Sequence, residues 1–436
     1  MSIPFRASAC LTAIVASGSL VSCRAIDGVI AYGQIRTEMR RPASAPPARM
    51  AIVEGMPVVH LYGSPQDRGT QYGTLLRKPL QAMHRCIDGI LDALTKARML
   101  AYADGQEEFL PAEIREELQA MSDTSGVPYM ELVALNITPE FSCSGLATWI
   151  PSTAGSTDDG GMIMGRNGDY FSLGFFQDRG MLVRVVHPRE GAAVAGVTFL
   201  AMIGSFTGMN DRGVAFGNMM VSNAAGPARQ TGGLTIQLAL RQAAMRASSA
   251  AEMGELLRRI KHVVPMNVMV ADRNEALVLE LAPGGTGVRR GDDGVLVAAN
   301  HFLSSELRRR EVVDPRFESL LAAGRNHRDP MTVEQMKQAL WDARRPKSNL
   351  QATIFEPAKM KMYVSINRVP ATAGPYVTLD LAALFAELPS KSVEATTSRR
   401  DTPGLGGPCA LGRHGHVAVS CQASDCRLSA RSSWPQ

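Results

Sequence analysis

The spacing of apolar residues changes from a helical to a strand-like period near residue 141. Between residues 68 and 100, apolar residues recur every three or four positions, which is typical of an amphipathic helix. Members of this pattern are Leu76, Leu80, Met83, Ile87, Ile90, Leu91 and Leu94. Shorter stretches with the same period lie around residues 114–121 and 130–135. We therefore expect the chain before residue 141 to be mostly helical.

Short β-rich runs bounded by Gly and Asp follow this helical part. The predicted strands are 161–166, 181–187, 193–203, 213–219, 267–271, 276–281, 295–299, 352–355 and 362–366, with helices at 234–245, 251–262 and 333–341. Runs of strands separated by a pair of helices favour sheets packed face to face with helices outside. The fold class predicted from this pattern is α+β.

The N-terminal residues resemble an export signal. A charge-free apolar stretch runs from Ala7 to Cys23, which is short for a membrane span. It ends in Leu20-Val21-Ser22-Cys23, which resembles the lipobox of bacterial lipoproteins. We interpret residues 1–22 as a lipoprotein-type signal peptide, with an ordinary secretory signal as the alternative. The protein is then expected to be periplasmic or membrane-anchored, touching the membrane only through a lipid on Cys23.

Two segments lack sustained apolar periodicity. Residues 23–50 are rich in Ala, Pro and Arg, as expected of a linker between an anchor and a domain. Residues 389–436 are rich in Ser, Gly, Arg and Pro and contain few large apolar residues, so we predict a disordered tail. The ordered body is expected to span residues 51–388.

Composition and charge narrow the function. The chain has 436 residues, 45% of them hydrophobic, and a formal net charge of +5, which is too small to indicate a nucleic-acid-binding surface. Cysteine spacing predicts neither a disulfide framework nor a metal site, because the tail lacks a C-x2-C pair. The seven cysteines are Cys10, Cys23, Cys86, Cys143, Cys409, Cys421 and Cys426. We predict no cofactor.

Five ordered motifs give Cys143 its context. They are Leu61-Tyr62-Gly63-Ser64; Cys143-Ser144 followed by Gly165-Arg166-Asn167-Gly168-Asp169; Gly208-Met209-Asn210-Asp211-Arg212-Gly213; Asn267 to Glu280; and Asn300-His301-Phe302. Together they resemble the peptidase C45 family, which includes the acyl-CoA:isopenicillin N acyltransferases and is related to choloylglycine hydrolases and acid ceramidase. The resemblance extends from Leu61 to about Pro370.

The resemblance implies an N-terminal-nucleophile (Ntn) hydrolase. Its fold is a four-layer α-β-β-α sandwich preceded by a helical pro-segment, here residues 51–142. Self-cleavage before Cys143 separates that segment from a catalytic domain, residues 143–388. The two fragments of the chain are then expected to remain together as a heterodimer.

The chemistry of such a site can be argued from the residues. An unperturbed thiol has a pKa of about 8.5 and needs a base or a cationic neighbour to form a thiolate near neutral pH. Cleavage before Cys143 would give it an α-amino group, with a pKa of about 7.7–8.0, within reach of its own sulfur. Strand alternation places Arg166 and Asp169 on opposite faces, so we expect a bulge or strand end before Asp169.

The resemblance also implies a role for each site residue. Arg166 lies beside the sulfur and favours the thiolate, while Asp169 accepts a hydrogen bond from the new ammonium group. Asn300 donates to the oxyanion, with Asn218, eight residues after Asn210, as a candidate second donor. Arg316, in Val313-Asp314-Pro315-Arg316-Phe317, helps to organise the site.

Simpler interpretations remain open at this point. Cys143 could be a small buried hydrophobe, and Arg166 and Asp169 a structural ion pair. Asn210 is typical of a turn, and Asn267 is compatible with a strand edge. Cys143 could also pair with His301 as in papain-like enzymes, although the helix-borne cysteine expected there is absent.

The predicted function is hydrolysis of a linear amide bond in a small N-acyl amide, or transfer of its acyl group, through a thioester on Cys143. Three other classes remain open: an acyl-CoA-dependent N-acyltransferase, which export makes less favourable because CoA is cytosolic; a bile-salt or penicillin amidase; and a non-catalytic binding protein on the same scaffold.

Overall fold

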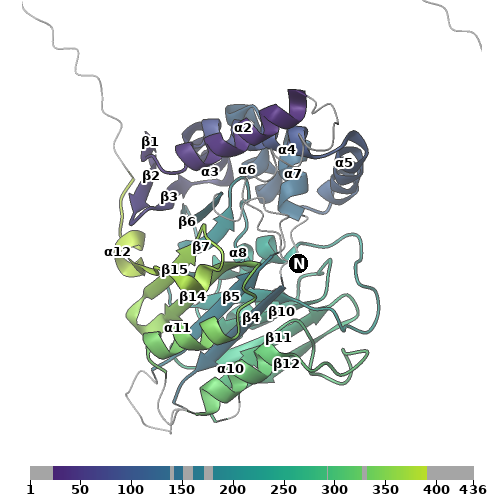
Figure 1. The fold of residues 1–436 in the computed structure, drawn as a ribbon, viewed down its shortest axis with the longest axis vertical. Coiled ribbons are helices and arrows are strands. Elements are labelled where there is room, and N and C mark those ends of the chain that lie inside the picture. The colour runs from purple at the N-terminus through teal and green to yellow at the C-terminus, as the bar shows by residue number, and fades with distance from the viewer. Residues whose placement is uncertain are drawn as a thin grey trace, which may run out of the picture. The chain divides into compact units, whose positions relative to one another are not determined.

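The computed structural model describes residues 23–137, 142–150, 161–170, 180–291, 293–326 and 331–389, and these form two sheets covered by helices (Figure 1). The ten-stranded sheet has the order β1-β2-β3-β6-β7-β8-β9-β10-β11-β12. Its strands are β1 Ala43–Ala45, β2 Ala48–Val53, β3 Met56–Gly63, β6 Met181–Pro188, β7 Val194–Phe199, β8 Thr207–Asn210, β9 Ala215–Met220, β10 Met266–Ala271, β11 Ala276–Ala282 and β12 Gly285–Arg290. The expected signal peptide and most of the expected tail lie outside the described residues.

The six-stranded sheet has the order β13-β4-β5-β14-β15-β16. Its strands are β4 Ser142–Thr148, β5 Ile163–Asp169, β13 Val295–Ala298, β14 Asn349–Glu356, β15 Lys361–Ile366 and β16 Val377–Asp380. The strands expected from the alternating runs are all present, with ends shifted by a few residues. Strand β12, which alternates between partly and fully exposed residues, was not predicted.

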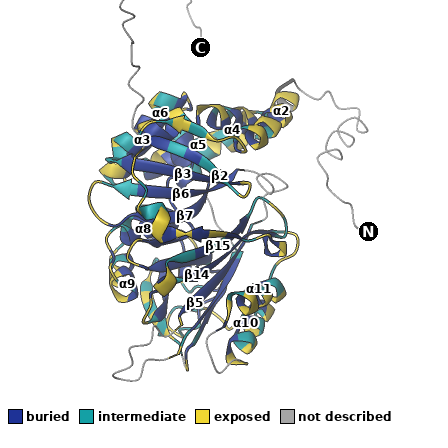
Figure 2. Cartoon of the chain, turned by 90° about the vertical axis from the view of Figure 1, so that its left-hand side faces the viewer, coloured by how far each residue is buried: buried dark blue, intermediate teal, exposed yellow. Residues whose placement is uncertain are grey.

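Apolar side chains define four layers. Val183 and Val197 of the ten-stranded sheet pack with Met164 and Phe355 of the six-stranded sheet in one buried cluster between the sheets. The outer face of the six-stranded sheet packs against α10 Pro315–Arg325 and α11 Val333–Asp342. The outer face of the ten-stranded sheet packs against several helices, including α8 Ile236–Ala244 and α9 Ala250–Arg258 (Figure 2). The predicted α-β-β-α sandwich is confirmed.

The segment before Cys143 is not only helical. Strands β1 to β3 belong to the ten-stranded sheet, and β3 pairs in parallel with β6, for instance Val58 with Val183. Its helices are α3 Pro65–Leu75, α4 Arg77–Ile90, α5 Ala93–Glu107, α6 Ala112–Ser125 and α7 Tyr129–Ile137. The long helix expected between residues 68 and 100 is thus three helices, and Asp92 begins the third by capping the backbone N–H of Thr95.

The prediction of a linker over residues 23–50 is wrong, because these residues form a helix and two strands. Helix α2 Cys23–Glu38 lies on α4, and Ala43–Ala45 and Ala48–Val53 form a β-hairpin. Ala31, Ile35 and Met39, spaced by four positions, make the buried stripe of α2 and the turn after it. Three apolar residues among many small and charged ones were too few to stand out as a helical pattern.

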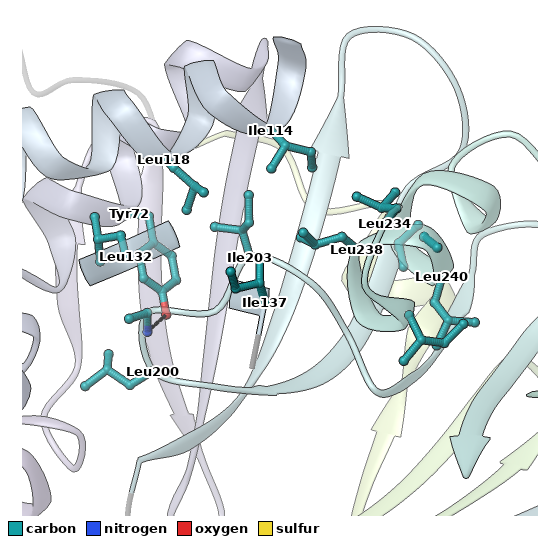
Figure 3. Close-up of a cluster of buried hydrophobic side chains, with 14 of the residues drawn as sticks. Tyr72, Ile114, Leu118, Leu132, Ile137, Leu200, Ile203, Leu234, Leu238 and Leu240 are labelled. Carbon is teal, nitrogen blue, oxygen red and sulfur yellow. Dashed lines mark hydrogen bonds between the residues drawn. The ribbon is translucent and has the colours of Figure 1, made fainter. Parts of the chain in front are cut away.

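Core contacts join the N-terminal helices to the rest of the chain. Tyr72 of α3 and Leu132 of α7 share a buried cluster with Ile203 and Leu238, and the Tyr72 hydroxyl accepts a hydrogen bond from the Ala201 N–H at 3.3 Å (Figure 3). No helix within the described parts of the chain is long and apolar enough to cross a membrane.

Candidate active site

Cys143 lies on β4 directly opposite Gly168 of β5, and Gly145 lies opposite Arg166. Cys143 and Arg166 therefore share one face as a diagonal cross-strand pair. Two glycines make room for the guanidinium group. A Cβ on Gly168 would lie 3.1 Å from Arg166 Nη1, and one on Gly217 would lie 2.5 Å from Arg166 Cδ.

Arg166 is fully buried and directs its donors at the sulfur and its surroundings. Its Nη2 donates to Cys143 Sγ at 2.9 Å, and Nη1 donates to Gln351 Oε1 at 2.9 Å. Nε and Nη2 also donate to the backbone carbonyl of Asn218, at 3.0 and 2.8 Å. The expected position of Arg166 beside the sulfur is confirmed. The alternative of an Arg166–Asp169 ion pair is wrong, since the ion-pair partner of Asp169 is Arg316.

The Cys143 thiol is completely buried in the intact chain. Burial raises the pKa of this thiol, while the charge of Arg166, a hydrogen bond from the Asp169 N–H and the charge of Arg316 act in the opposite direction. Burial, together with the negative charge of the Asp169 carboxylate, outweighs them, so the pKa of Cys143 lies above its ordinary value. Near neutral pH the sulfur is a neutral thiol and requires a base to react.

Asn300 presents its amide oxygen to the backbone nitrogen of Cys143. The Cys143 N–H donates to Asn300 Oδ1 at 3.1 Å, and the hydroxyl of Ser142 donates to the same oxygen at 2.8 Å. Asn300 Nδ2 donates to the Met220 carbonyl at 2.6 Å. The expected role was an oxyanion donor, but in the intact chain Asn300 meets Cys143 through its oxygen, and the Met220 carbonyl takes one of the two Nδ2 hydrogens. In the intact chain Asn300 is an acceptor for the nitrogen that cleavage would turn into an amine.

Asp169 ends β5, opposite Ser142. The bulge expected before Asp169 is absent from β5, which pairs regularly with β4 up to Asp169, so simple alternation holds and Asp169 faces away from Arg166. The register shift lies in the neighbouring β14, between Asn349 and Gln351. The buried carboxylate accepts from Asn349 Nδ2 at 3.0 Å and from Arg316 Nη1 at 3.3 Å. Burial raises the pKa of Asp169 above its ordinary value despite these donors.

Arg316 connects the carboxylate to Asn300. It lies in the first turn of α10, where Asp314 caps the helix and accepts from Arg316 Nη2 at 2.7 Å. Nη2 also donates to Asn300 Oδ1 at 2.7 Å, and Nη1 donates to the Cys143 carbonyl at 3.4 Å. The organising position expected of Arg316 is present in the structure.

Asn218 differs from the expectation. Its neighbours Gly217 and Met219 face the space between the sheets, where they lie against Arg166 and Gly145. The Asn218 side chain lies on the other face of β9, where its Nδ2 is 3.8 Å from Met266 Sδ. Its Oδ1 is buried and accepts no hydrogen bond from the described residues. Strand alternation therefore turns its amide away from the sulfur, and only its backbone carbonyl contributes to the site.

The turn that carries Asn300 is held by buried side chains. Asn267 of β10 donates to the carbonyls of Ala299 and His301, at 2.9 and 2.8 Å, so it is not a strand-edge residue. Glu280 of β11 accepts from the N–H groups of Leu303 and Ser304, at 2.8 and 3.1 Å. The motif residues Asn267 and Glu280 thus position Asn300.

Asn349 and Gln351 were missed by sequence reasoning. Gln351 Oε1 accepts a hydrogen bond from Arg166, and Asn349 Nδ2 donates one to the Asp169 carboxylate. Both come from β14, far along the chain, and belong to no recognised motif. Both stand at the start of an otherwise apolar strand, and the register shift between them turns Asn349 toward Asp169 and Gln351 toward Arg166, on opposite faces of β14.

His301 is not placed as a papain-like base. Its ring lies edge-on to Phe317, with ring centroids 5.2 Å apart. Burial lowers the pKa of His301, and the charged groups acting on it are Asp314, Arg289, Arg316 and Glu280. The sulfur's hydrogen-bond partner is Arg166. Asn210 is a turn residue, as expected, since its Oδ1 accepts from the N–H groups of Arg212 and Val214.

One group of side chains outside this site has the geometry of a cation site. His84, Asp88 and Glu131 bring one potential ligand atom each within 4.8 Å of one another. Lys96 Nζ lies against Asp88 and, at 3.4 Å, against Glu131, so an ammonium already supplies the positive charge there. The cysteines and histidines of the tail lie outside the described residues.

Residues 156–368 match the family model of acyl-coenzyme A:6-aminopenicillanic acid acyl-transferase. This part of the chain, slightly less than half of the 436 residues, is similar to that acyl-transferase family. The matched residues include Arg166, Asp169, Asn218, Asn300 and Arg316, whereas Cys143 lies before them. This likeness supports acyl transfer or amide hydrolysis as the class of chemistry, and the identity of the nucleophile is a separate question.

The curated relatives that this chain matches are distant in sequence. It is 24% identical over 317 residues to an uncharacterized protein of Archaeoglobus fulgidus, a match that covers 58% of this chain and 51% of the relative. It is 25% identical over 185 residues to protein dcd1B of Dictyostelium discoideum, covering 36% of each. The chain thus spans about half the length of the first relative and about a third of the second.

Solved structures show partial likeness. A Caenorhabditis elegans N-acylethanolamine-hydrolyzing acid amidase ortholog has a TM-score of 0.39 at 14% identity, covering 49% of this chain and 93% of its own. A conjugated bile acid hydrolase mutant from Clostridium perfringens has 0.39 at 15%, covering 55% and 93%. Penicillin V acylase from Agrobacterium tumefaciens has 0.35 at 10%, covering 51% and 82%. The likeness to the acyl-transferase family rests on residues 156–368.

Proposed function

We propose that the protein is a self-processing cysteine Ntn hydrolase that cleaves a linear amide bond of a small N-acyl amide. The observation that carries this proposal is the double restraint on Cys143. Its sulfur lies 2.9 Å from Arg166 Nη2, and its backbone nitrogen donates to Asn300 Oδ1 at 3.1 Å. Separate groups thus hold the sulfur and the nitrogen of Cys143. This suits a residue whose sulfur is the nucleophile and whose nitrogen is the base.

Self-cleavage is proposed at the Ser142–Cys143 bond. The Cys143 sulfur attacks the Ser142 carbonyl carbon, the C–N bond breaks, and the Cys143 nitrogen takes up the proton from the thiol. Water then hydrolyses the resulting thioester, which releases the Ser142 carboxylate and leaves a free α-amine on Cys143. The Ser142 hydroxyl now bound to Asn300 Oδ1 would leave with the N-terminal fragment.

Turnover is proposed to repeat this sequence on a substrate. The α-amine takes the thiol proton as the sulfur attacks the amide carbonyl carbon, and it returns that proton to the departing amine. Water hydrolyses the thioester and regenerates the thiol. Arg166 supports the developing thiolate, while Asn300 Oδ1 and Asp169 orient the ammonium form of the base. A second amine in place of water would give acyl transfer.

Removal of Ser142 also makes the enclosed thiol accessible in this proposal. In the intact chain the sulfur is fully buried and Ser142 lies opposite Asp169 and against Asn300. Departure of Ser142 from these contacts would leave the acyl group of a substrate a place beside the sulfur. The N-terminal fragment would stay bound through the parallel pairing of β3 with β6.

The other candidate functions make different predictions. An acyl-CoA-dependent N-acyltransferase would need CoA thioesters as donors, and a penicillin or bile-salt amidase would cleave only those amides. A papain-like enzyme would be active without a free Cys143 amine. A binding protein would hold N-acyl amides without consuming them.

The test is a screen of N-acyl amides, and of amines with an acyl-CoA thioester as donor, against wild-type protein and two variants. We expect amine release by the wild type and none by Cys143→Ala, with Cys86→Ala as the control for a buried cysteine outside the site. Amidase activity that persists in Cys143→Ala would contradict the proposal.

Export and lipid attachment at Cys23 form a separate part of the proposal. Helix α2 begins at Cys23, and its Ile26, Val29 and Ile30 are 50%, 40% and 55% exposed at a spacing of three to four residues. A lipid on Cys23 would bring this face to a bilayer. Mass spectrometry of the membrane fraction should find a lipidated fragment beginning at Cys23, and a Cys23→Ala protein should be released from membranes.

A further inference from the structure

Four charged side chains are buried where the N-terminal helices pack against β6. Arg68 of α3, Glu117 of α6, Arg184 of β6 and Arg241 of α8 have relative exposures of 4%, 1%, 1% and 2%. Strand alternation turns Arg184 toward the helices, since its neighbours Val183 and Val185 face the other sheet. Three guanidinium groups thus surround one carboxylate, which leaves a formal charge of +2 in this cluster.

Two of the arginines, Arg68 and Arg241, donate hydrogen bonds to the Glu117 carboxylate. Arg68 donates through Nη2 to Glu117 Oε2 at 2.9 Å and through Nε at 3.3 Å. Arg241 donates through Nη1 to Oε1 at 3.0 Å and through Nη2 to Oε2. Arg184 Nη1 stays 3.9 Å from Oε1, beyond hydrogen-bond distance. The third guanidinium is left without a carboxylate partner of its own.

Several buried N–H donors of this cluster have no acceptor among the described residues. These are Nε and Nη2 of Arg184 and Nε of Arg241. The remaining contact of Arg184 is a long one, from Nη1 to the Met202 carbonyl at 3.4 Å. Unpaired donors on a buried charged group are costly, and native proteins satisfy them with an acceptor.

Loss of a proton from Arg184 does not remove the excess positive charge of the cluster near neutral pH. Burial lowers the pKa of Arg184 to about 9, with Arg241 adding to the effect, so the group stays charged near neutral pH. The other groups acting on these arginines are Tyr72, whose pKa burial raises to about 12, and Glu113, whose side chain is exposed. Neither supplies a buried negative charge.

We propose that Arg184, together with Arg241 and Arg68, forms a buried binding site for a compact inorganic anion, with chloride as its physiological ligand. The anion accepts hydrogen bonds from Arg184 Nε and Nη2 and reduces the excess positive charge. We infer a compact anion because α3 and α6, which carry Arg68 and Glu117, are already in close contact: a Cβ on Gly69 would lie 2.1 Å from the Glu117 carbonyl oxygen. Larger oxyanions would have to separate these helices.

The ligands of this site come from both sides of the proposed cleavage point. Arg68 and Glu117 precede Cys143, while Arg184 and Arg241 follow it (Figure 2 shows α3 and α6 above β3 and β6). A bound anion therefore stabilises the association of the N-terminal segment with the rest of the chain. This holds for the intact chain as well, so the inference does not depend on self-cleavage.

Thermal unfolding of full-length protein in sodium chloride and in sodium gluconate, at matched ionic strength, tests the proposal. Between about 1 and about 300 mM chloride, the Tm of the wild type should rise by several degrees more than in gluconate. Arg184→Met removes the unpartnered guanidinium and should abolish the difference. Arg189→Met, at a 71% exposed arginine just after β6, should retain it.

A direct measurement keeps the test independent of whether Arg184→Met folds. Crystals of the wild type grown in bromide should show an anomalous peak within hydrogen-bond distance of Arg184 Nε and Nη2. A chloride response equal to that in gluconate, a response that survives Arg184→Met, or bromide peaks at the surface alone would each overturn the proposal.

Discussion

The backbone nitrogen of Cys143 donates a hydrogen bond to Oδ1 of Asn300 at 3.1 Å, and Arg316 Nη2 donates to the same oxygen at 2.7 Å. The nitrogen that would serve as the base is thus fixed before it is a free amine. The NH2 group of Asn300 donates to the Met220 carbonyl. Asn267 donates to the carbonyls of Ala299 and His301, the two neighbours of Asn300. Preorganisation of this kind places a base without reorganisation during the reaction.

Asn300→Leu should abolish this acceptor while keeping a side chain of similar size. Without it, the α-amine of Cys143 loses its orientation, and we expect kcat to fall by about 100-fold or more, the usual loss for a preorganised active-site contact. Steady-state kinetics on processed protein measure the effect. Asn326→Leu, at an exposed position, is the matched control and should leave kcat unchanged.

Arg166→Met should make the thiol less acidic. Arg166 opposes the effect of burial on the pKa of Cys143, so its removal raises that pKa further. Iodoacetamide should then alkylate processed protein more slowly between about pH 6 and 8. The variant also leaves the Asn218 carbonyl and Gln351 Oε1 without their donor, which costs about 1–3 kcal/mol of stability. An unchanged alkylation profile would exclude Arg166 from thiolate support.

Gly217→Ala separates the position of Arg166 from its charge. The added Cβ would lie 2.5 Å from Arg166 Cδ, so the guanidinium must shift away from the sulfur while its charge is kept. We expect slower alkylation and turnover, in the same direction as Arg166→Met. Gly284→Ala, where a Cβ meets nothing within 4 Å, is the control.

Motif order predicted Arg166 beside the sulfur, whereas the bulge expected before Asp169 is not in β5 and the register shift lies in β14. The sequence did not predict site residues whose position depends on which face of a distant strand turns toward the site. Asn218 has the expected spacing, yet β9 directs Gly217 and Met219 to the site instead. Asn349 and Gln351 reach the site only through the pairing of β14 with β5, which no local pattern encodes.

Asp169→Asn should affect processing and turnover far more than folding. The substitution keeps the shape and an acceptor for Asn349 but removes the charge facing Arg316 and the proposed ammonium. By analogy with other orienting carboxylates, we expect a loss of about 100- to 10,000-fold in kcat. The readout is kcat on protein of verified processing, with Tm measured alongside. A variant with full activity at matched processing would remove Asp169 from the mechanism.

Two buried histidines, His60 of β3 and His187 of β6, should make stability depend on pH. His60 Nδ1 lies 3.2 Å from His187 Nε2, and the described C-terminal residues reach this pair through Glu387, 3.0 Å from His60. Burial, with Arg49 and His187 adding to it, lowers the pKa of His60 to about 3, and burial lowers that of His187 to about 4. Both are neutral in the folded protein.

The sign follows from proton uptake. Between the ordinary value of 6.5 and these lowered pKa values, the unfolded chain binds more protons than the folded one, so stability is complete above 6.5 and is lost as pH falls. His187→Gln should flatten the fall of Tm between about pH 7 and 4. His84→Gln should steepen it, because a hydrogen bond to Glu131 raises the pKa of His84 and stabilises the protein at low pH.

The N-terminus of the purified catalytic fragment tests the central claim most directly. Mature protein should separate on a denaturing gel into two fragments, and N-terminal sequencing of the larger one should begin at Cys143, followed by Ser144, Gly145 and Leu146. Cys143→Ala should remain a single chain. Amidase activity in a wild-type preparation whose mass shows no break between Ser142 and Cys143 would contradict the account.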